Sequence, residues 1–203
     1  MARASVVLVA GVSCSGKTTL ARVLAAKLDA AYVAIDDYYR PYAELPLEIR
    51  KKVNFDSPEA IEHELLVHHL TRLRSGETIA KPMYDPAGFR RRPEIEPVHA
   101  DRAVIVEGLF SLYWDDLRAQ ADLSVFVDTP DEVCQQRRLE RDVRQYGRSP
   151  EESLTRYRNH VRPNQMRYVL PTRNYSDVVV SGTQDIRISL SQVQERLGVP
   201  QLA

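Results

Sequence analysis

The chain has 203 residues, a length that fits one α/β domain with at most a small added subdomain. Apolar residues make up 43% of it, enough for a proper core, and 28 basic residues balance 28 acidic ones. The zero net charge disfavours a nucleic-acid coat or a membrane-surface protein, because both carry a clear basic excess. No apolar run approaches the roughly 20 residues of a membrane-spanning helix. We expect one cytoplasmic domain over residues 1–203, without nucleic-acid or membrane partners.

Short runs rich in Val and Ile alternate with amphipathic segments, which is typical of βαβ units and a mainly parallel sheet. Continuous apolar runs suit strands that helices cover on both faces. The helix after the first run carries Leu20 and Leu24 on its predicted buried stripe. The five predicted strands are residues 5–10, 31–35, 103–106, 123–127 and 177–180.

Three Ser/Thr-Pro pairs predict where helices begin. Thr129 and Ser149 each precede a proline and lie three residues before a glutamate, the pattern of a capping box. Ser57 offers a similar start for a helix that we expect to end at Gly76. Asp128 follows a predicted strand, and we expect it to serve as a cap.

Residues 77–100 break the alternation, because they combine several prolines with Gly88 and three consecutive arginines. This composition favours a hairpin or an irregular excursion near a site over a core helix. A second irregular point, Gly147, separates two predicted helices. It marks a helical lid over about residues 137–156, of the kind that closes over a kinase site and excludes water.

Residues 11–18 have the pattern Gly-x4-Gly-Lys-Thr of a phosphate-binding loop. Gly11 and Gly16 permit backbone angles that aim successive N–H groups at phosphate oxygens. Lys17 adds positive charge for the β- and γ-phosphates, and the Thr18 hydroxyl is placed to hold Mg²⁺. A chance glycine turn is the alternative, but the apolar strand before the loop and the amphipathic helix after it argue against that. The expected nucleotide contacts are Gly11, Ser13, Cys14, Ser15, Gly16, Lys17, Thr18 and Thr19.

Acidic residues follow two of the predicted strands. Ligands of an open parallel sheet bind beyond the carboxyl ends of its strands, which is where Asp36 and Glu107 are expected. Phosphoryl transfer needs a group that orients or deprotonates the attacking hydroxyl, and oxygen ligands for Mg²⁺. We assign Asp36 as the catalytic base, and Asp36, Thr18 and Glu107 as the metal-binding residues. Helix capping or plain solvation is the alternative for each acid taken singly.

Arginines recur at helical spacing after the fourth predicted strand. Like charges on one helix face repel each other, so the pattern indicates a bound anion such as a triphosphate. A solvated face paired with nearby glutamates is the alternative. We expect Arg137 and Arg141 to contact the triphosphate. The arginines predicted to share this face are Arg137, Arg141, Arg144 and Arg148, with Arg138 beside them.

These motifs resemble those of the uridine–cytidine kinases, within the phosphoribulokinase/uridine kinase group of P-loop kinases. The resemblance runs from Val6 to about Gly182. It implies a three-layer α/β P-loop NTPase fold with a five-stranded, mainly parallel sheet. It also implies ATP with Mg²⁺ and a nucleoside-like small-molecule acceptor. Its markers are residues 11–19, 36–40, 54–59, 82–85, 106–108, 126–129, 137–142, 147–148 and 170–178.

The resemblance implies roles for residues at the acceptor end. Asp56 would hold the ribose hydroxyls, and Tyr84 would contact the base. Arg138 and Arg148 would face the acceptor, and Arg141 the triphosphate. The adenine would lie near the turn at residues 181–182.

Three positions depart from the family pattern. Phe89 takes the place of a base-reading imidazole, Tyr146 that of a lid arginine, and Arg156 that of a glutamine. Phenylalanine can stack on a base but cannot hydrogen-bond to its edge. We therefore expect Phe89 and Arg156 in the acceptor site, where they bear on the choice of acceptor rather than on the phosphate loop.

The leading prediction is phosphorylation of the 5′-hydroxyl of uridine or cytidine by Mg²⁺-ATP. An alternative keeps the kinase chemistry and changes the acceptor to another nucleoside, a sugar or a sugar phosphate. A nucleotide-binding regulator without an acceptor is the least favoured, because the chain carries both Asp36 and Asp56. The sequence leaves open whether the chain forms homo-oligomers.

Overall fold

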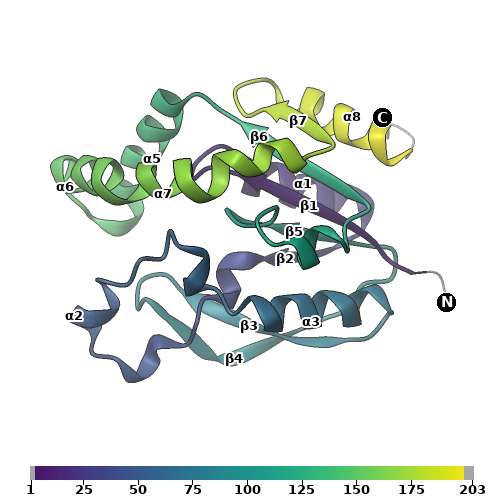
Figure 1. Cartoon of the computed structure of the whole chain (residues 1–203), viewed down its shortest axis with the longest axis horizontal. Helices are drawn as coiled ribbons and strands as arrows, with labels where there is room; N and C mark the ends of the chain where they lie inside the picture. Colours follow the sequence, from purple (N-terminus) through teal and green to yellow (C-terminus); the bar gives the residue numbers. More distant parts are fainter. Residues whose placement is uncertain (1–2, 199–203) are drawn as a thin grey trace.

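The computed structural model describes residues 3–198. A five-stranded parallel sheet lies at its centre, in the order β2–β5–β1–β6–β7, with helices on both faces (Figure 1). Every strand end lies within one residue of its predicted position, so the predicted α/β sheet is confirmed. The strands are β1 (Ser5–Gly11), β2 (Ala31–Ala34), β5 (Ala103–Glu107), β6 (Leu123–Asp128) and β7 (Val178–Ser181).

The side chains of β1 alternate between two buried cores, because successive residues of a strand point to opposite faces. Val6 and Leu8 pack into the core that contains α3 (His63–Arg74). Val7 and Val9 pack into the other core, which is closed by α1 (Lys17–Leu28) and α8 (Ile186–Leu197). Both faces of the sheet are therefore covered, and this explains why the strands read as continuous apolar runs.

A separate antiparallel hairpin, β3 (Ile79–Asp85) and β4 (Arg90–Val98), lies beside α3 on the lower side of Figure 1. The hairpin predicted for residues 77–100 is therefore confirmed. Phe89, in the turn between the two strands, has a positive φ of 50°. This left-handed conformation is uncommon outside glycine, and it places the ring at the end of the hairpin.

The helix predicted from Ser57 to Gly76 is wrong at its start. Pro58–Ala60 forms only a 3-10 turn, and the chain then extends before α3 begins at His63. The buried Ile61 forms a backbone bridge with Tyr39. These tertiary contacts override the local helix signal and tie this segment to the one that follows β2.

The helix cap predicted at Ser149 is confirmed: its hydroxyl oxygen accepts the Glu152 N–H at 3.1 Å, at the start of α6 (Pro150–Arg156). The one predicted at Thr129 is wrong, because its hydroxyl donates to the Ser15 carbonyl at 2.8 Å. The helix α5 (Asp131–Tyr146) begins without a side-chain cap. The phosphate loop thus uses the hydroxyl that the sequence assigned to the helix.

Asp128 does not act as a cap either. Its carboxylate forms an ion pair with Arg173 at 3.3 Å. Its backbone carbonyl accepts the Gly182 N–H at 2.8 Å, which joins the ends of β6 and β7. The long-range partners Arg173 and Gly182 therefore take the place of the local helix N–H groups that a cap would bind.

The helices α5 and α6 meet at Gly147, whose φ of 62° ends α5. The corner between them lies at the left of Figure 1, away from both termini. It coincides with the predicted helical lid, although closure of that lid stays a prediction. Helical turns continue from α6 to Tyr175 as η4 (Tyr157–Val161), α7 (Arg162–Asn164), η5 (Gln165–Val169) and η6 (Leu170–Tyr175).

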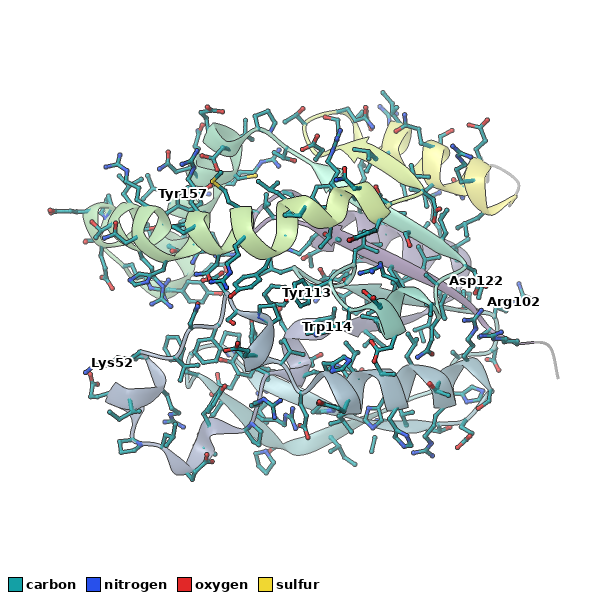
Figure 2. All side chains as sticks on the ribbon, viewed as in Figure 1. Lys52, Arg102, Tyr113, Trp114, Asp122 and Tyr157 are labelled. Atoms are coloured by element: carbon teal, nitrogen blue, oxygen red, sulfur yellow. The ribbon has the colours of Figure 1, made fainter. Side chains whose placement is uncertain are left out.

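An aromatic bridge joins this helical segment to α3 (Figure 2). Trp114 stacks on His63 of α3, with 4.9 Å between the ring centroids. Tyr113 meets Tyr168 of the helical segment edge to face, at 5.9 Å.

Within residues 3–198, no helix combines the length and the apolar character needed to cross a membrane. The remaining short helices are η1 (Ile35–Tyr38), η2 (Tyr42–Glu44), α2 (Leu47–Arg50) and α4 (Asp115–Arg118).

Candidate active site

A cavity of about 790 Å³ opens where β1 and β2 end. The cavity is lined by most of the site residues predicted from the sequence. Gly11, Ser15 and Glu107 are the exceptions. Glu107 nevertheless lies close to Thr18. The nominated residues that line the cavity are Ser13, Cys14, Gly16, Lys17, Thr18, Thr19, Asp36, Asp56, Tyr84, Phe89, Arg137, Arg138, Arg141, Arg148 and Arg156.

The phosphate loop has the predicted order of strand, turn and helix, since β1 ends at Gly11 and α1 begins at Lys17. Gly11 and Gly16 have φ angles of 153° and 101°, which favour glycine. A Cβ on Gly11 would lie 2.7 Å from the Val127 carbonyl oxygen. The loop can therefore present its N–H groups to an anion at the start of a helix.

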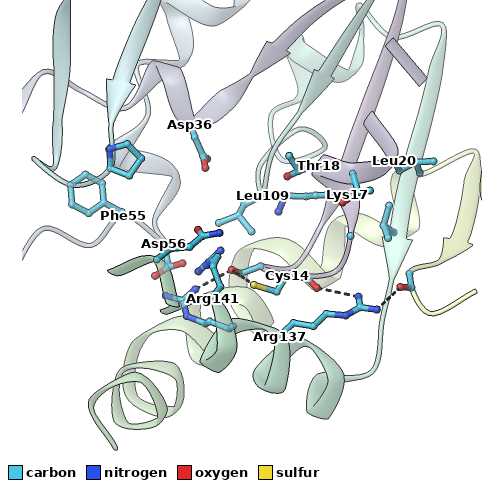
Figure 3. Close-up of a pocket in the computed structure, with 18 of the residues that line it drawn as sticks. Cys14, Lys17, Thr18, Leu20, Asp36, Phe55, Asp56, Leu109, Arg137 and Arg141 are labelled. Atoms are coloured by element: carbon cyan, nitrogen blue, oxygen red, sulfur yellow. Dashed lines mark hydrogen bonds between the residues drawn. The ribbon is translucent and has the colours of Figure 1, made fainter. Parts of the chain in front are cut away.

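A clamp of hydrogen bonds holds this loop against the turn after β7. Arg137 donates to the Gly182 carbonyl at 3.0 Å and to the Cys14 carbonyl at 3.4 Å (Figure 3). A Cβ on Gly182 would lie only 2.0 Å from the Ser15 carbonyl oxygen, so only glycine allows this approach. The clamp thus shapes the end of the cavity where the resemblance implied the adenine.

Asp36 lies in the first turn after β2 and points into the cavity, opposite Lys17 and Thr18 (Figure 3). The surrounding protein desolvates this carboxyl and raises its pKa to about 6. Glu107 adds to the rise, whereas Lys17 opposes it. The side chain is exposed to water in the cavity, which screens part of the effect. A carboxylate with a raised pKa in a cleft is suited to accept a proton.

Glu107 ends β5 and is buried, with 6% of its surface exposed. Its carboxylate accepts hydrogen bonds from the Tyr32 hydroxyl at 2.8 Å and the Thr18 hydroxyl at 3.2 Å. Burial and the nearby Glu107 raise the pKa of Tyr32 above its ordinary value, so it remains a donor. Carboxylate and hydroxyl oxygens are the ligands that Mg²⁺ prefers, so these residues fit that ion. No sequence motif signalled the role of Tyr32.

Four aromatic rings form a wall at the other end of the cavity, beside Asp56. Tyr39 lies 5.0 Å from both Phe55 and Tyr84, and Phe55 lies 5.8 Å from Phe89, between ring centroids. Sequence reasoning singled out Tyr84 and Phe89 and missed the other two. The two missed rings, Tyr39 and Phe55, lie in the motif segments 36–40 and 54–59, and these motifs could have indicated them.

Asp142 gathers the arginines of the site and was not anticipated. Its carboxylate is fully buried and lies 3.2 Å from Arg141, 3.1 Å from Arg148 and 3.6 Å from Arg138. Burial favours a higher pKa for Asp142, but the arginines outweigh it and lower the pKa below the ordinary value. Much of the repulsion among these arginines is therefore offset within the fold, by Asp142 rather than by the glutamates of the alternative interpretation.

Of the predicted arginine face, one member lies on the helix but away from the cavity, and another lies beyond the helix. Arg144 is exposed and does not line the cavity. Arg148 is not on α5, because the helix ends at Tyr146, but it reaches Asp142 from beyond the turn. Arg138 instead lies inside, where it donates to the Ser13 hydroxyl at 3.0 Å.

Arg156 of α6 is half-buried in the acceptor end of the cavity. Burial and the neighbouring Arg148 lower its pKa, while Asp56 opposes the change. No other residue of the described chain, 3–198, forms a hydrogen bond or ion pair with its guanidinium. Its donors are therefore available to a ligand.

Comparison with known proteins agrees with this geometry. The model of the phosphoribulokinase/uridine kinase family matches residues 6–189. A uridine kinase of Aeromonas hydrophila is 36% identical over 196 residues, which cover 93% of this chain and 92% of that protein. A uridine kinase of Chloroflexus aurantiacus is 38% identical over 192 residues, with the same coverage.

The solved phosphoribulokinase from Rhodobacter spheroides superposes with a TM-score of 0.64 at 16% identity, covering 89% of this chain and 71% of that one. At this identity the likeness concerns the fold alone. The family model spans the phosphate loop, the hairpin, the α5–α6 corner and the first turn of α8. The chain belongs to the phosphoribulokinase/uridine kinase family.

Proposed function

We propose that the chain transfers the γ-phosphoryl group of ATP to the 5′-hydroxyl of uridine or cytidine. The observation that carries the proposal is the position of Asp36, which faces Lys17 across a cavity with a phosphate loop at one end. The other end offers Asp56 and an aromatic wall, which suit a sugar diol and a planar base. Relatives named uridine kinase support this choice of acceptor.

The residues of the chain divide the chemistry between them. The loop N–H groups and Lys17 bind the β- and γ-phosphates, and Asp36 takes the proton of the attacking hydroxyl. Arg141 and Arg138 offset the charge of the transferring group in a cavity from which closure would exclude water. Mg²⁺, when bound through Thr18, Glu107 and Asp36, would neutralise charge on the phosphate oxygens.

At the acceptor end, Asp56 would accept hydrogen bonds from the ribose hydroxyls. The rings of Tyr84 and Phe89 would contact the base, and the guanidiniums of Arg148 and Arg156 would donate to its oxygen atoms. Arg donates and never accepts, so these two side chains suit a carbonyl-bearing base.

The same residues favour a second candidate acceptor, a hydroxyl compound that carries an anionic group, such as a sugar phosphate. Phe89 provides no hydrogen bond to a base edge, and the Arg156 guanidinium forms no hydrogen bond or ion pair with another residue of 3–198. Unpaired guanidinium donors beside Arg148 would bind phosphate oxygens well.

A panel of acceptors assayed for ADP formation at saturating Mg²⁺-ATP tests the proposal. The panel holds uridine, cytidine, purine nucleosides, free sugars and sugar phosphates, with an acceptor-free sample as the control. We expect the highest kcat/KM for uridine or cytidine. Activity with sugar phosphates alone would favour the second candidate. Slow ATP hydrolysis that no acceptor changes would contradict both and favour a regulator.

Cytoplasmic location and the lack of nucleic-acid partners stay predictions.

A further inference from the structure

Lys81 is a buried cation on β3 that does not line the cavity. Only 4% of its surface is exposed, which is rare for a lysine unless its charge is paired. Its ammonium group contacts the Asp37 carboxylate closely and lies 3.1 Å from a Glu96 oxygen. Glu96 is about half exposed, so Asp37 is the buried partner.

Asp37 connects two segments that both line the cavity. One carboxylate oxygen meets Lys81, and the other accepts the backbone N–H of Tyr84 at 3.2 Å. Asp37 directly follows Asp36 in η1, and Tyr84 belongs to the aromatic wall on β3. The register of the β3–β4 ladder shifts between Pro82 and Tyr84. Asp37 therefore holds β3 at the point where the hairpin ladder is irregular.

The buried charge of Lys81 selects this arrangement. A buried ammonium without a carboxylate partner is strongly unfavourable, so Lys81 keeps Asp37 turned toward the hairpin. In that orientation the second oxygen of Asp37 is held against the Tyr84 N–H. Without Lys81, a half-buried carboxylate would gain by turning to water and would release Tyr84.

We propose that Lys81 is a positioning residue that acts through Asp37. It joins the segment carrying Asp36 to the strand carrying Tyr84, and so sets the separation between the base that receives the proton and the wall that holds the acceptor. The inference rests on the proposed kinase function. Small displacements of reacting groups cost large factors in rate. Because Tyr84 belongs to the aromatic wall at the acceptor end of the cavity, we expect this link through Lys81 and Asp37 to affect the acceptor rather than the nucleotide.

The first test compares Lys81→Met with Glu96→Gln, a control that changes the exposed carboxylate on the other side of the same ammonium. We expect Lys81→Met to raise the acceptor KM by on the order of tenfold and to leave the KM for Mg²⁺-ATP nearly unchanged. The control should change neither. Equal rises in both KM values, or an unchanged acceptor KM, would overturn the proposal.

A rescue separates positioning from a general loss of stability. Lys81→Met combined with Asp37→Asn removes the unpaired carboxylate, while the Asn oxygen can still accept the Tyr84 N–H. We expect the double variant to recover most of the acceptor KM lost in Lys81→Met alone. A double variant that is worse than Lys81→Met contradicts the mechanism.

Hydrogen exchange gives a readout that does not depend on the acceptor. We expect the Tyr84 amide to exchange on the order of tenfold faster in Lys81→Met than in the wild type, and to regain protection in the double variant. Unchanged exchange in Lys81→Met would show that Lys81 does not hold Tyr84 through Asp37. If the wild type phosphorylates no acceptor of the panel, the proposed function fails, but this measurement still decides the role of Lys81.

Discussion

At the scale of single residues, the site depends on how charge is arranged around Asp36. Desolvation by the surrounding protein disfavours its ionised form most, Glu107 and Asp56 add to this effect, and Lys17 opposes it. The result is a carboxyl group that titrates closer to neutrality than an ordinary aspartate. Such tuning suits a general base, whose pKa is most useful near the working pH.

This arrangement predicts the pH dependence of the reaction. Only the ionised carboxylate can take the hydroxyl proton, so kcat/KM for the acceptor should fall as the pH drops through about 6 and level off above it. An unperturbed aspartate would keep activity down to about pH 4. Circular dichroism at each pH serves as the control for folding. A profile that stays flat to about pH 4.5 would contradict the role of Asp36.

At the scale of secondary structure, the corner of α5 and α6 depends on Asp142. Its carboxylate binds arginines from α5 and from the turn after it, and accepts the Ser153 hydroxyl of α6 at 3.1 Å. One buried acid therefore holds the helices of the predicted lid together and prepositions the arginines at the cavity.

Asp142→Asn should destabilise the protein by about 3 kcal/mol, because it leaves buried guanidiniums without a counter-charge. The matched control is Asp131→Asn, on the same helix as Asp142. It weakens a partly exposed ion pair with Arg162 of α7, while the Asn oxygen can still accept the Tyr157 hydroxyl, so it should cost about 1 kcal/mol or less. Urea unfolding at neutral pH measures both. Equal stability of the two variants would show that Asp142 is not the centre of the corner.

The sign of the pH effect follows from the lowered pKa of Asp142. A carboxyl whose pKa is lowered by folding stabilises the protein above its ordinary pKa, and this contribution is lost as the pH falls through the lowered value. The difference in stability between the wild type and Asp142→Asn should therefore shrink only in strong acid.

The elements differ in how far the sequence predicts them. The five strands were predicted closely because burial on both faces leaves a continuous apolar run. The helix start at Ser57 failed because Ile61 found a long-range partner, and the cap at Thr129 failed because the phosphate loop took its hydroxyl. The role of Asp142 was missed because the sequence shows one acid among many arginines and does not show that three of them contact it.

At the scale of the whole molecule, the described chain places its candidate ligand-binding residues around one end of the five-stranded sheet. The phosphate loop, Asp36 and the arginines come from segments far apart in the sequence, and two cores on opposite faces of the sheet hold them in place. We expect residues 1–203 to unfold as a single cooperative domain.

Ligand binding should stabilise this unit as a whole. Mg²⁺-ATP at 100 times its Kd adds about 2.7 kcal/mol to the free energy of unfolding, which a thermal scan detects as a rise in Tm. With EDTA present, ATP alone should raise Tm much less, because Thr18 and Glu107 would bind no metal. Equal shifts with and without Mg²⁺ would contradict the metal site.

The most direct test of the central claim is a rapid-quench measurement of a single turnover of ATP and nucleoside by the wild type and Asp36→Asn. We predict that the variant transfers the phosphoryl group about 10² to 10⁴ times more slowly, while its Kd for Mg²⁺-ATP changes little. A variant that binds Mg²⁺-ATP normally and still transfers phosphate near the wild-type rate would contradict the account.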